Sequence, residues 1–167
     1  MDKSLKSILW NQCGAAIDTL ENAILECPEQ LWGDRSQQPE YWYIAYHTLF
    51  WLDFYFSDSH EGFTPPAPFT LCEMDPAGLL PEKVYSKAEL LDYLQHGRRK
   101  ARAAIENLTF EKSLKNFKFG STDLSYLELI PYNMRHVQHH AAQLNLILRQ
   151  KTNSAPRWVF RAKNHNQ

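Results

Sequence analysis

Three histidines within five positions stand out near the C-terminal end of the chain. They lie in the stretch R-H-V-Q-H-H-A-A-Q-L, Arg135 to Leu144. At about 100° per residue, His136 and His140 stack one above the other at the edge of an apolar helical stripe, whereas His139 turns towards the polar face. Two imidazoles at this spacing can share one divalent cation. Two ligands are too few for a stable site, however, and an isolated HxxxH pair is more often an ordinary part of a solvated helix.

His47 is the candidate for a third ligand. It is the only imidazole in the aromatic stretch Y-I-A-Y-H-T-L-F-W. Taken alone, it is interpreted as a core histidine with one hydrogen bond. Burial of an imidazole costs free energy unless its nitrogen atoms have hydrogen-bond partners. In the alternative interpretation a metal takes one nitrogen, and Tyr46, Asp53 or a backbone carbonyl holds the other.

The three histidines together indicate more than each does alone. A histidine on one helix and an inward HxxxH pair on another are what a helical bundle needs to build a metal site in its core. Three neutral imidazoles suit Zn²⁺, Ni²⁺ or Fe²⁺, and they leave coordination positions open for water or substrate. The sequence therefore predicts a metal site made of His47, His136 and His140, with Gln143 on the same side as a supporting residue.

Four segments with helical periodicity must position these residues. The predicted helices run from Leu5 to Glu26, from Gln38 to Ser57, from Ser86 to Leu108 and from Ser125 to Gln150. The third and fourth begin with capping boxes, S-K-A-E and S-Y-L-E. Pro131 either kinks the fourth helix or moves its start one turn later. With almost no strand signal, this pattern predicts an all-α fold, an antiparallel four-helix bundle.

The bundle is expected to form one domain over residues 1–150, followed by a tail over 151–167. A Pro-rich passage from His60 to Pro81 is predicted to be a loop, and a loop of that length in a compact domain is more often functional than idle. The second helix is apolar nearly all round, so it is either central or covered by a partner chain. This favours a homodimer. The tail sequence R-W-V-F-R is expected to dock on the bundle or on a partner.

Composition excludes several classes of protein. The chain has 167 residues and a net charge of −1, which gives no reason to expect a nucleic-acid partner. No apolar stretch is long enough to span a membrane. Cys13, Cys27 and Cys72 lie far apart, so a reduced, cytoplasmic protein is the simplest interpretation. Cys13 lies on an apolar stripe and reads as a core residue before a nucleophile. The basic run H-G-R-R-K, His96–Lys100, reads as a solvated face, with binding of an anionic substrate as the minor alternative.

Other catalytic signatures are absent from the sequence. Every glycine is isolated, so there is no phosphate-binding loop, and neither GxSxG nor HExxH occurs. No ExxH pair precedes His136 or His140, which argues against a ferritin-like iron site. The tri-histidine site is therefore the one candidate centre, and no residue is assigned a catalytic role.

At these residues the chain resembles the DinB-like superfamily of metal-binding four-helix bundles. The family pattern in the fourth helix is close to H-x-x-H-H-x-G-Q, in which the first histidine and the one three before the glutamine are ligands. His136, His140 and Gln143 match these positions, His139 matches a frequent non-ligand histidine, and Ala142 replaces the glycine.

The resemblance implies a function as well as a fold. It implies an up-down-down-up bundle, often dimeric, with a divalent ion held by His47, His136 and His140. Relatives with assigned activities are mainly metal-dependent thiol transferases or isomerases that act with low-molecular-weight thiols. We therefore expect thiol transfer on a small molecule, or related hydrolysis by metal-activated water. The alternative is a non-catalytic protein, either a metal-stabilised dimeric binding or stress-response protein or a bundle with vestigial histidines.

Overall fold

Four long helices form the body of the protein. The computed structural model describes residues 2–36, 38–57 and 61–163. The long helices are α1 (Lys3–Glu26), α3 (Tyr41–Tyr55), α4 (Lys87–Glu106) and α6 (Tyr126–Thr152). The short elements are α2 (Glu29–Trp32), the 3₁₀ helix η1 (Leu71–Met74), α5 (Phe110–Ser113), β1 (Asn116–Phe119) and β2 (Thr122–Ser125). The predicted all-α bundle is confirmed, and a two-stranded hairpin is added to it.

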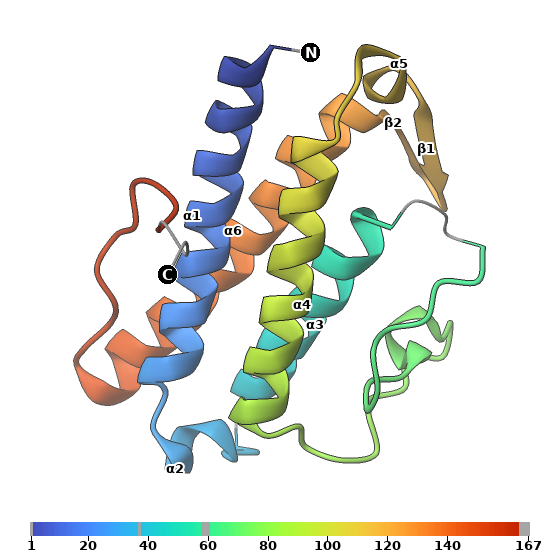
Figure 1. The fold of residues 1–167 in the computed structure, drawn as a ribbon. Helices are drawn as coiled ribbons and strands as arrows, with labels where there is room; N and C mark the ends of the chain where they lie inside the picture. Colours follow the sequence, from blue (N-terminus) through green and yellow to red (C-terminus); the bar gives the residue numbers. More distant parts are fainter. Residues whose placement is uncertain (1, 37, 58–60, 164–167) are drawn as a thin grey trace.

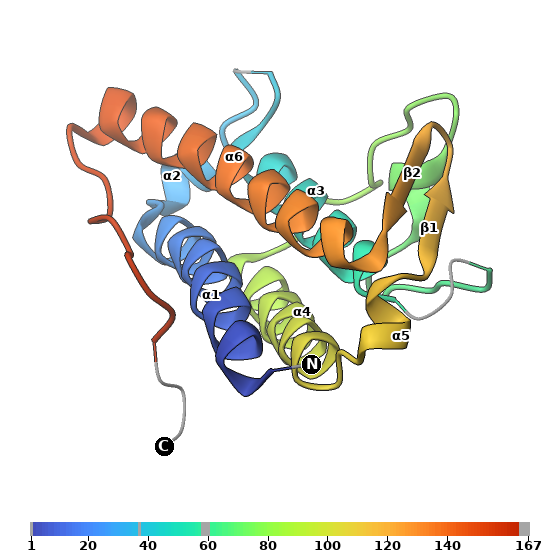
Figure 2. The same cartoon turned by 90° about the horizontal axis from the view of Figure 1, so that it is seen from above.

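The helices form a ring in which α1 and α3 each pack against both α4 and α6. Figure 1 shows that α1 and α6 run in one direction along the bundle and that α3 and α4 run in the other. The bundle therefore has the up-down-down-up order. Seen from above in Figure 2, α3 lies beside α6, with the hairpin and the loop segments towards the same end of the molecule. This pairing of α3 with α6 is what can bring His47 near the fourth-helix histidines.

Helix α3 is the central element. The side chains of this helix are buried, except for the half-exposed Tyr43, His47 and Trp51. These residues are spaced four apart, so they form one row along the helix. Because α4, α6 and the Pro-rich segment cover the rest of α3, the central position is the one observed of the two alternatives given for this helix. Its apolar surface does not require a partner chain.

Capping fixes the starts of the third and fourth predicted helices. Ser86 and Ser125 each accept a hydrogen bond from the backbone of a glutamate three residues later, and Glu89 and Glu128 return the contact. Since α6 begins directly after Ser125, Pro131 lies in its second turn, and the alternative of a start one turn later is wrong. The second predicted helix is shorter than expected, because α3 begins at Tyr41 and ends at Tyr55.

The C-terminal tail packs on the bundle. After α6 the chain turns through Asn153, whose φ is 57°, and returns along α1. The amide of Ala162 donates to the carbonyl oxygen of Asn11 at 2.9 Å, and the amide of Lys163 donates to the Asp18 carboxylate at 2.7 Å. A Cβ at Gly14 would lie 2.5 Å from that of Ala162, so this glycine makes room for the tail. Of the two alternatives for the tail, docking on the bundle is therefore observed.

The basic run of α4 is not the solvated face that its composition predicts. Arg98 is only 5% exposed and pairs with Asp18 and Glu21 of α1. Lys100 pairs with Asp53 of α3. The prediction is wrong because it takes no account of carboxylates on the neighbouring helices. Arg98 and Lys100 therefore connect α4 to both of its neighbours.

Two simpler expectations hold. Cys13 is 3% exposed, and burial raises the pKa of its thiol to about 12, as expected of a core residue. In the part of the chain that the structure describes, no helix combines the length and hydrophobicity that a bilayer span requires.

Candidate metal centre

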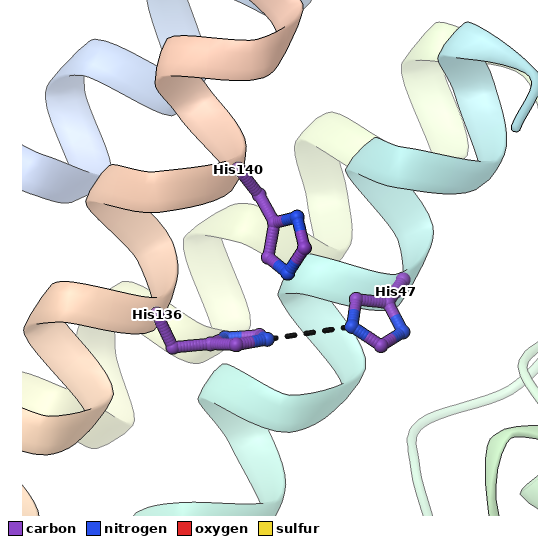
Figure 3. Close-up of side chains that lie close together, drawn as sticks. All are labelled: His47, His136 and His140. Atoms are coloured by element: carbon purple, nitrogen blue, oxygen red, sulfur yellow. Dashed lines mark hydrogen bonds between the residues drawn. The ribbon is translucent and has the colours of Figure 1, made fainter.

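The three predicted histidines meet between α3 and α6. One ring nitrogen from each of His47, His136 and His140 lies within 4.8 Å of the others. The Nε2 atoms of His47 and His136 face one another at 3.4 Å, as Figure 3 shows. The ring centroid of His140 lies 4.8 Å from that of His47 and 4.6 Å from that of His136. His139 is exposed and does not belong to this group.

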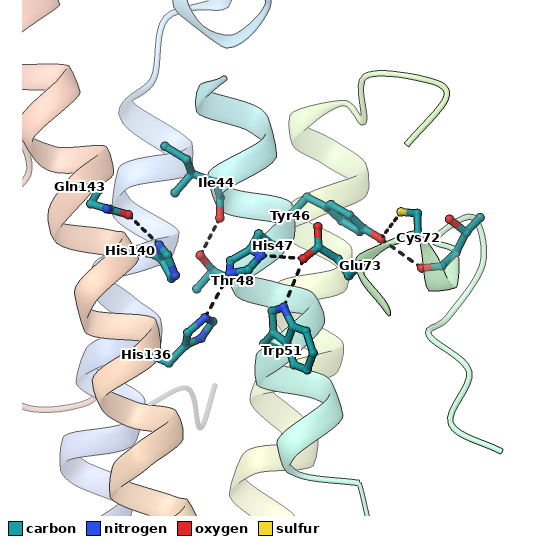
Figure 4. A network of polar contacts seen from close by, with 11 residues as sticks. Ile44, Tyr46, His47, Thr48, Trp51, Cys72, Glu73, His136, His140 and Gln143 are labelled. Carbon is teal, nitrogen blue, oxygen red and sulfur yellow. Dashed lines mark hydrogen bonds and ion pairs between the residues drawn. The ribbon is translucent and has the colours of Figure 1, made fainter. Parts of the chain in front are cut away.

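A buried carboxylate orients His47. The Oε2 atom of Glu73, on η1, lies 2.6 Å from Nδ1 of His47 and accepts a second hydrogen bond from Nε1 of Trp51 at 3.2 Å (Figure 4). The Glu73 side chain is only 4% exposed. Because a carboxylate is an acceptor, it favours the tautomer in which Nδ1 of His47 carries the proton. The lone pair of Nε2 then points towards the other two histidines.

Burial alone would raise the pKa of the Glu73 carboxyl group. The hydrogen bond from His47, its charge when that ring is protonated, and hydrogen bonds from Tyr43 and Trp51 outweigh that effect and lower the pKa of Glu73 below its ordinary value. Glu73 is therefore ionised at neutral pH, as an acceptor for an imidazole N–H must be.

Gln143 orients the ring of His140 in the same way as Glu73 orients the ring of His47. Its Oε1 atom lies 2.7 Å from Nδ1 of His140. The amide oxygen accepts the Nδ1 proton, which leaves the Nε2 lone pair of His140 directed towards the cluster. The expectation that Gln143 supports the site is met, and the two residues are one turn apart on the same helix (Figure 4).

His136 has no such support. Its Nδ1 atom is buried and has no hydrogen-bond partner among the described residues. Burial, with smaller effects from the neighbouring imidazoles, lowers the pKa of His136 to about 3. Burial is also the main cause that lowers the pKa of His140. These two rings are therefore neutral at physiological pH, which is the form that binds metals.

The donor set fits a divalent cation. Nitrogens of three imidazoles converge in a half-buried pocket, and the Nε2 atoms of His47 and His136 are within hydrogen-bond distance, so a bound cation would replace the proton that one of them shares with the other. The observed 3.4 Å between two Nε2 atoms is near the value of about 3.3 Å that imidazoles have in a tetrahedral zinc site with bonds of about 2.05 Å. Imidazole donors suit Zn²⁺, Ni²⁺ or Fe²⁺.

Two hollows open beside the cluster. The first has a volume of about 240 Å³ and is lined by Pro39, Tyr43, Ile44, His47, His140 and Gln143. The second has a volume of about 370 Å³ and is lined by Tyr132, Arg135, His136 and His139. Both hollows have mainly apolar walls, but only the second is lined by a cation, Arg135. Small molecules can therefore approach His47 and His140 from the first hollow and His136 from the second.

The sequence-based choice of partners for His47 is wrong. Tyr46 directs its hydroxyl group to the carbonyl oxygen of Thr70 at 3.1 Å and to Sγ of Cys72 at 3.2 Å. Asp53 is bound by side chains of α4. The actual partner, Glu73, lies 26 residues from His47 along the chain, and no periodicity relates a loop residue to a helix. The one available signal was an acidic residue within a long, Pro-rich loop.

Comparison with known proteins supports the same assignment. The family model of the DinB superfamily matches residues 12–144. The chain belongs to the DinB superfamily. The matched range contains all three histidines of this DinB-superfamily protein as well as Glu73 and Gln143. Searches of curated proteins and of solved structures gave no match.

Proposed function

We propose that this DinB-superfamily protein is a metal-dependent enzyme that uses His47, His136 and His140 for thiol transfer, or related hydrolysis, on a small molecule. The observation that carries the proposal is the convergence of three imidazoles beside two hollows. A structural metal site is normally closed by four protein ligands, whereas three histidines leave room for a reactant.

The chain would hold Zn²⁺, Ni²⁺ or Fe²⁺ through the three inward-facing nitrogens. When bound, such an ion lowers the pKa of a thiol or water and so supplies a nucleophile at neutral pH. Glu73 and Gln143 keep the rings of His47 and His140 in the orientation and tautomer that binding requires. Tyr43 and Ile44 form an apolar wall that limits the access of water to the site.

The proposal also includes a homodimer in the cytoplasm. Since α3 is covered within its own chain, the dimer interface would lie elsewhere. The tail offers exposed aromatic side chains for it, because Trp158 is 73% and Phe160 is 76% exposed. Sedimentation at several protein concentrations tests the dimer, and a monomer at all of them would contradict it.

The function is tested with the purified full-length protein. It is expressed without added metals, and elemental mass spectrometry identifies the bound element. Thiol consumption is then measured with model electrophiles, before and after EDTA treatment and after readdition of the metal. We expect activity that is lost with the metal and restored by it. Arg149→Gln is the matched control, because it removes an exposed side chain of the same helix that lines neither hollow of the cluster.

Two results would contradict the proposal. Activity that persists after complete removal of metal would show that the three histidines do not carry the reaction. A protein that binds metal and melts at a higher temperature with it, yet consumes no thiol with any electrophile, would favour the metal-stabilised, non-catalytic alternative.

A further inference from the structure

The second hollow has the character of an anion subsite. Of its four lining residues, Arg135 and His139 offer hydrogen-bond donors, Tyr132 offers an aromatic ring, and His136 belongs to the metal centre. No carboxylate lines it. A substrate group bound here would therefore meet the cation of Arg135 and the ring of His136, which belongs to the metal centre.

Arg135 is available to bind a ligand. Its guanidinium group lies over the ring of Tyr132, with 5.9 Å between the guanidinium carbon and the ring centroid. Among the described residues it forms no ion pair, in contrast to Arg98 and Arg102, which pair with carboxylates. The nearby Glu128 is occupied by the capping box, where it accepts from the amide and hydroxyl groups of Ser125. The nearest acid of the metal centre, Glu73, is held by His47 and Trp51.

The geometry points to a carboxylate on the substrate. We propose that the thiol used by this protein carries a carboxylate group, which binds Arg135 in the Tyr132–Arg135–His136–His139 hollow while the sulfur end faces the three histidines. This inference rests on the function proposed above and deepens it. A guanidinium group matches a carboxylate with two parallel hydrogen bonds, and the ring of Tyr132 offers this group a cation–π contact. Because Arg135 directly precedes His136, one helix carries both the anion subsite and a metal ligand.

The other hollow supplies the contrast. Beside the site residues His47, His140 and Gln143, its walls are Pro39, Tyr43 and Ile44, and no arginine or lysine is among the described residues that line it. A carboxylate has no charged partner there. A charged thiol is therefore expected on the Arg135 side, which leaves the apolar hollow for an uncharged second reactant.

The test measures thiol binding to the cobalt-loaded, full-length protein. Thiolate-to-cobalt absorption in the near ultraviolet reports binding without any turnover. The probes are 3-mercaptopropionate, which carries a carboxylate, and 2-mercaptoethanol, which is neutral. We expect the wild type to bind 3-mercaptopropionate about tenfold more tightly, as one charge-assisted contact at a partly exposed site allows. Arg135→Gln should remove this preference and leave the affinity for 2-mercaptoethanol unchanged.

Two further variants sharpen the result. Arg135→Lys should keep part of the preference, since the charge stays and the paired hydrogen bonds are lost. Arg149→Gln removes an exposed arginine of the same helix that lines neither hollow of the metal centre, and it should change nothing. The visible spectrum of the bound cobalt should be the same in all variants, which shows that the metal centre is intact.

The possible failures are distinguishable. If both thiols bind with equal affinity, or if Arg135→Gln keeps the preference, the anion subsite is wrong and the proposed function stands. If cobalt binds but neither thiol changes the near-ultraviolet spectrum, the proposed thiol chemistry at this centre is contradicted. The proposal of a carboxylate-bearing thiol is then contradicted as well.

Discussion

Two polar residues of the same helix behave in opposite ways. Asp53 and His47 both lie on the apolar helix α3, six positions apart. Asp53 is 1% exposed, and both of its oxygens are taken by α4: Lys100 and His96 approach Oδ1, with His96 at 3.3 Å, and the Tyr93 hydroxyl donates to Oδ2 at 3.1 Å. His47 receives one partner from the protein, Glu73, and its other nitrogen faces two more imidazoles.

The difference separates a structural cluster from a binding cluster. Around Asp53 the neighbours are donors and the acceptor is a carboxylate, so the protein completes the network by itself. Around His47 the inward groups are all imidazole nitrogens, of which those of His47 and His136 lie within hydrogen-bond distance, and all three can direct lone pairs at one cation. A cluster of like metal-binding side chains therefore indicates a ligand, whereas a carboxylate matched by donors indicates a structural network.

The largest expected effect is on the metal affinity of His47→Ala and His136→Ala. Each variant removes one of three ligands, so affinity should fall by more than the roughly 10- to 100-fold that loss of an outer hydrogen-bond partner causes. Competition with a coloured chelator measures it. His139→Ala, on the exposed face, should bind as the wild type does. Equal loss in all three variants would mean that the histidines of α6 do not form a distinct site.

Asp53→Ala should affect stability and leave metal binding almost unchanged. The substitution deprives Lys100 and His96 of their buried partner, and we expect the free energy of unfolding to fall by about 3 kcal/mol. The lower end of the usual range applies because the side chains of Lys100 and His96 both reach solvent. Denaturant unfolding of the metal-free protein measures the change. A large loss of metal affinity at unchanged stability would reverse the roles assigned to the two clusters.

Glu73→Gln should weaken metal binding by about 10- to 100-fold with little effect on folding. The amide keeps the size of the side chain but loses the charge that stabilises the Nδ1 proton of His47. Glu82→Gln, an exposed acid further along the same connection, is the matched control. Chelator competition again gives the affinity, and wild-type binding by Glu73→Gln would show that the carboxylate does not orient His47.

The last prediction concerns the pH dependence of the stability of the metal-free protein. The pKa of His136 is about 3 in the folded state and about 6.5 when unfolded, so the unfolded chain takes up the proton first as pH falls. Stability should be unaffected by this residue above pH 6.5 and should decrease below it, by up to about 1.4 kcal/mol per pH unit until the folded-state pKa is reached. Chemical denaturation between about pH 7 and pH 5 measures the slope. His136→Phe should flatten it, and an unchanged slope would exclude His136 as its source.

The sequence was sufficient to predict the features that depend on the helical period or on residues close together in the chain. The spacing of His136, His140 and Gln143 placed all three on one side of α6, and the two capping boxes fixed the starts of α4 and α6. Such patterns are local, so they can be read without knowing the fold. The family resemblance then supplied the pairing of α3 with α6 that periodicity alone does not give.

The errors concern contacts between distant segments. Glu73 was missed because its distance from His47 depends on the path of a loop, and Asp53 was assigned to the wrong network because its partners lie on α4. The basic run on α4 was misread for the same reason, since Asp18 and Glu21 become its neighbours only after α1 packs beside it. The hairpin β1–β2 is only four residues on each side, too short for an alternating pattern to emerge.

The direction of the helices has a consequence for how such a centre can change. Because α3 and α4 are neighbours that run the same way, the chain must travel back along the bundle before α4 can begin. In its described part that return path has one short 3₁₀ helix, η1, which lies beside the middle of α3 and brings Glu73 to His47. Insertions or substitutions in this one connection can alter the outer support of a metal ligand without disturbing helix packing. The topology thus gives the bundle a place where the reactivity of its centre can be retuned while the scaffold stays constant.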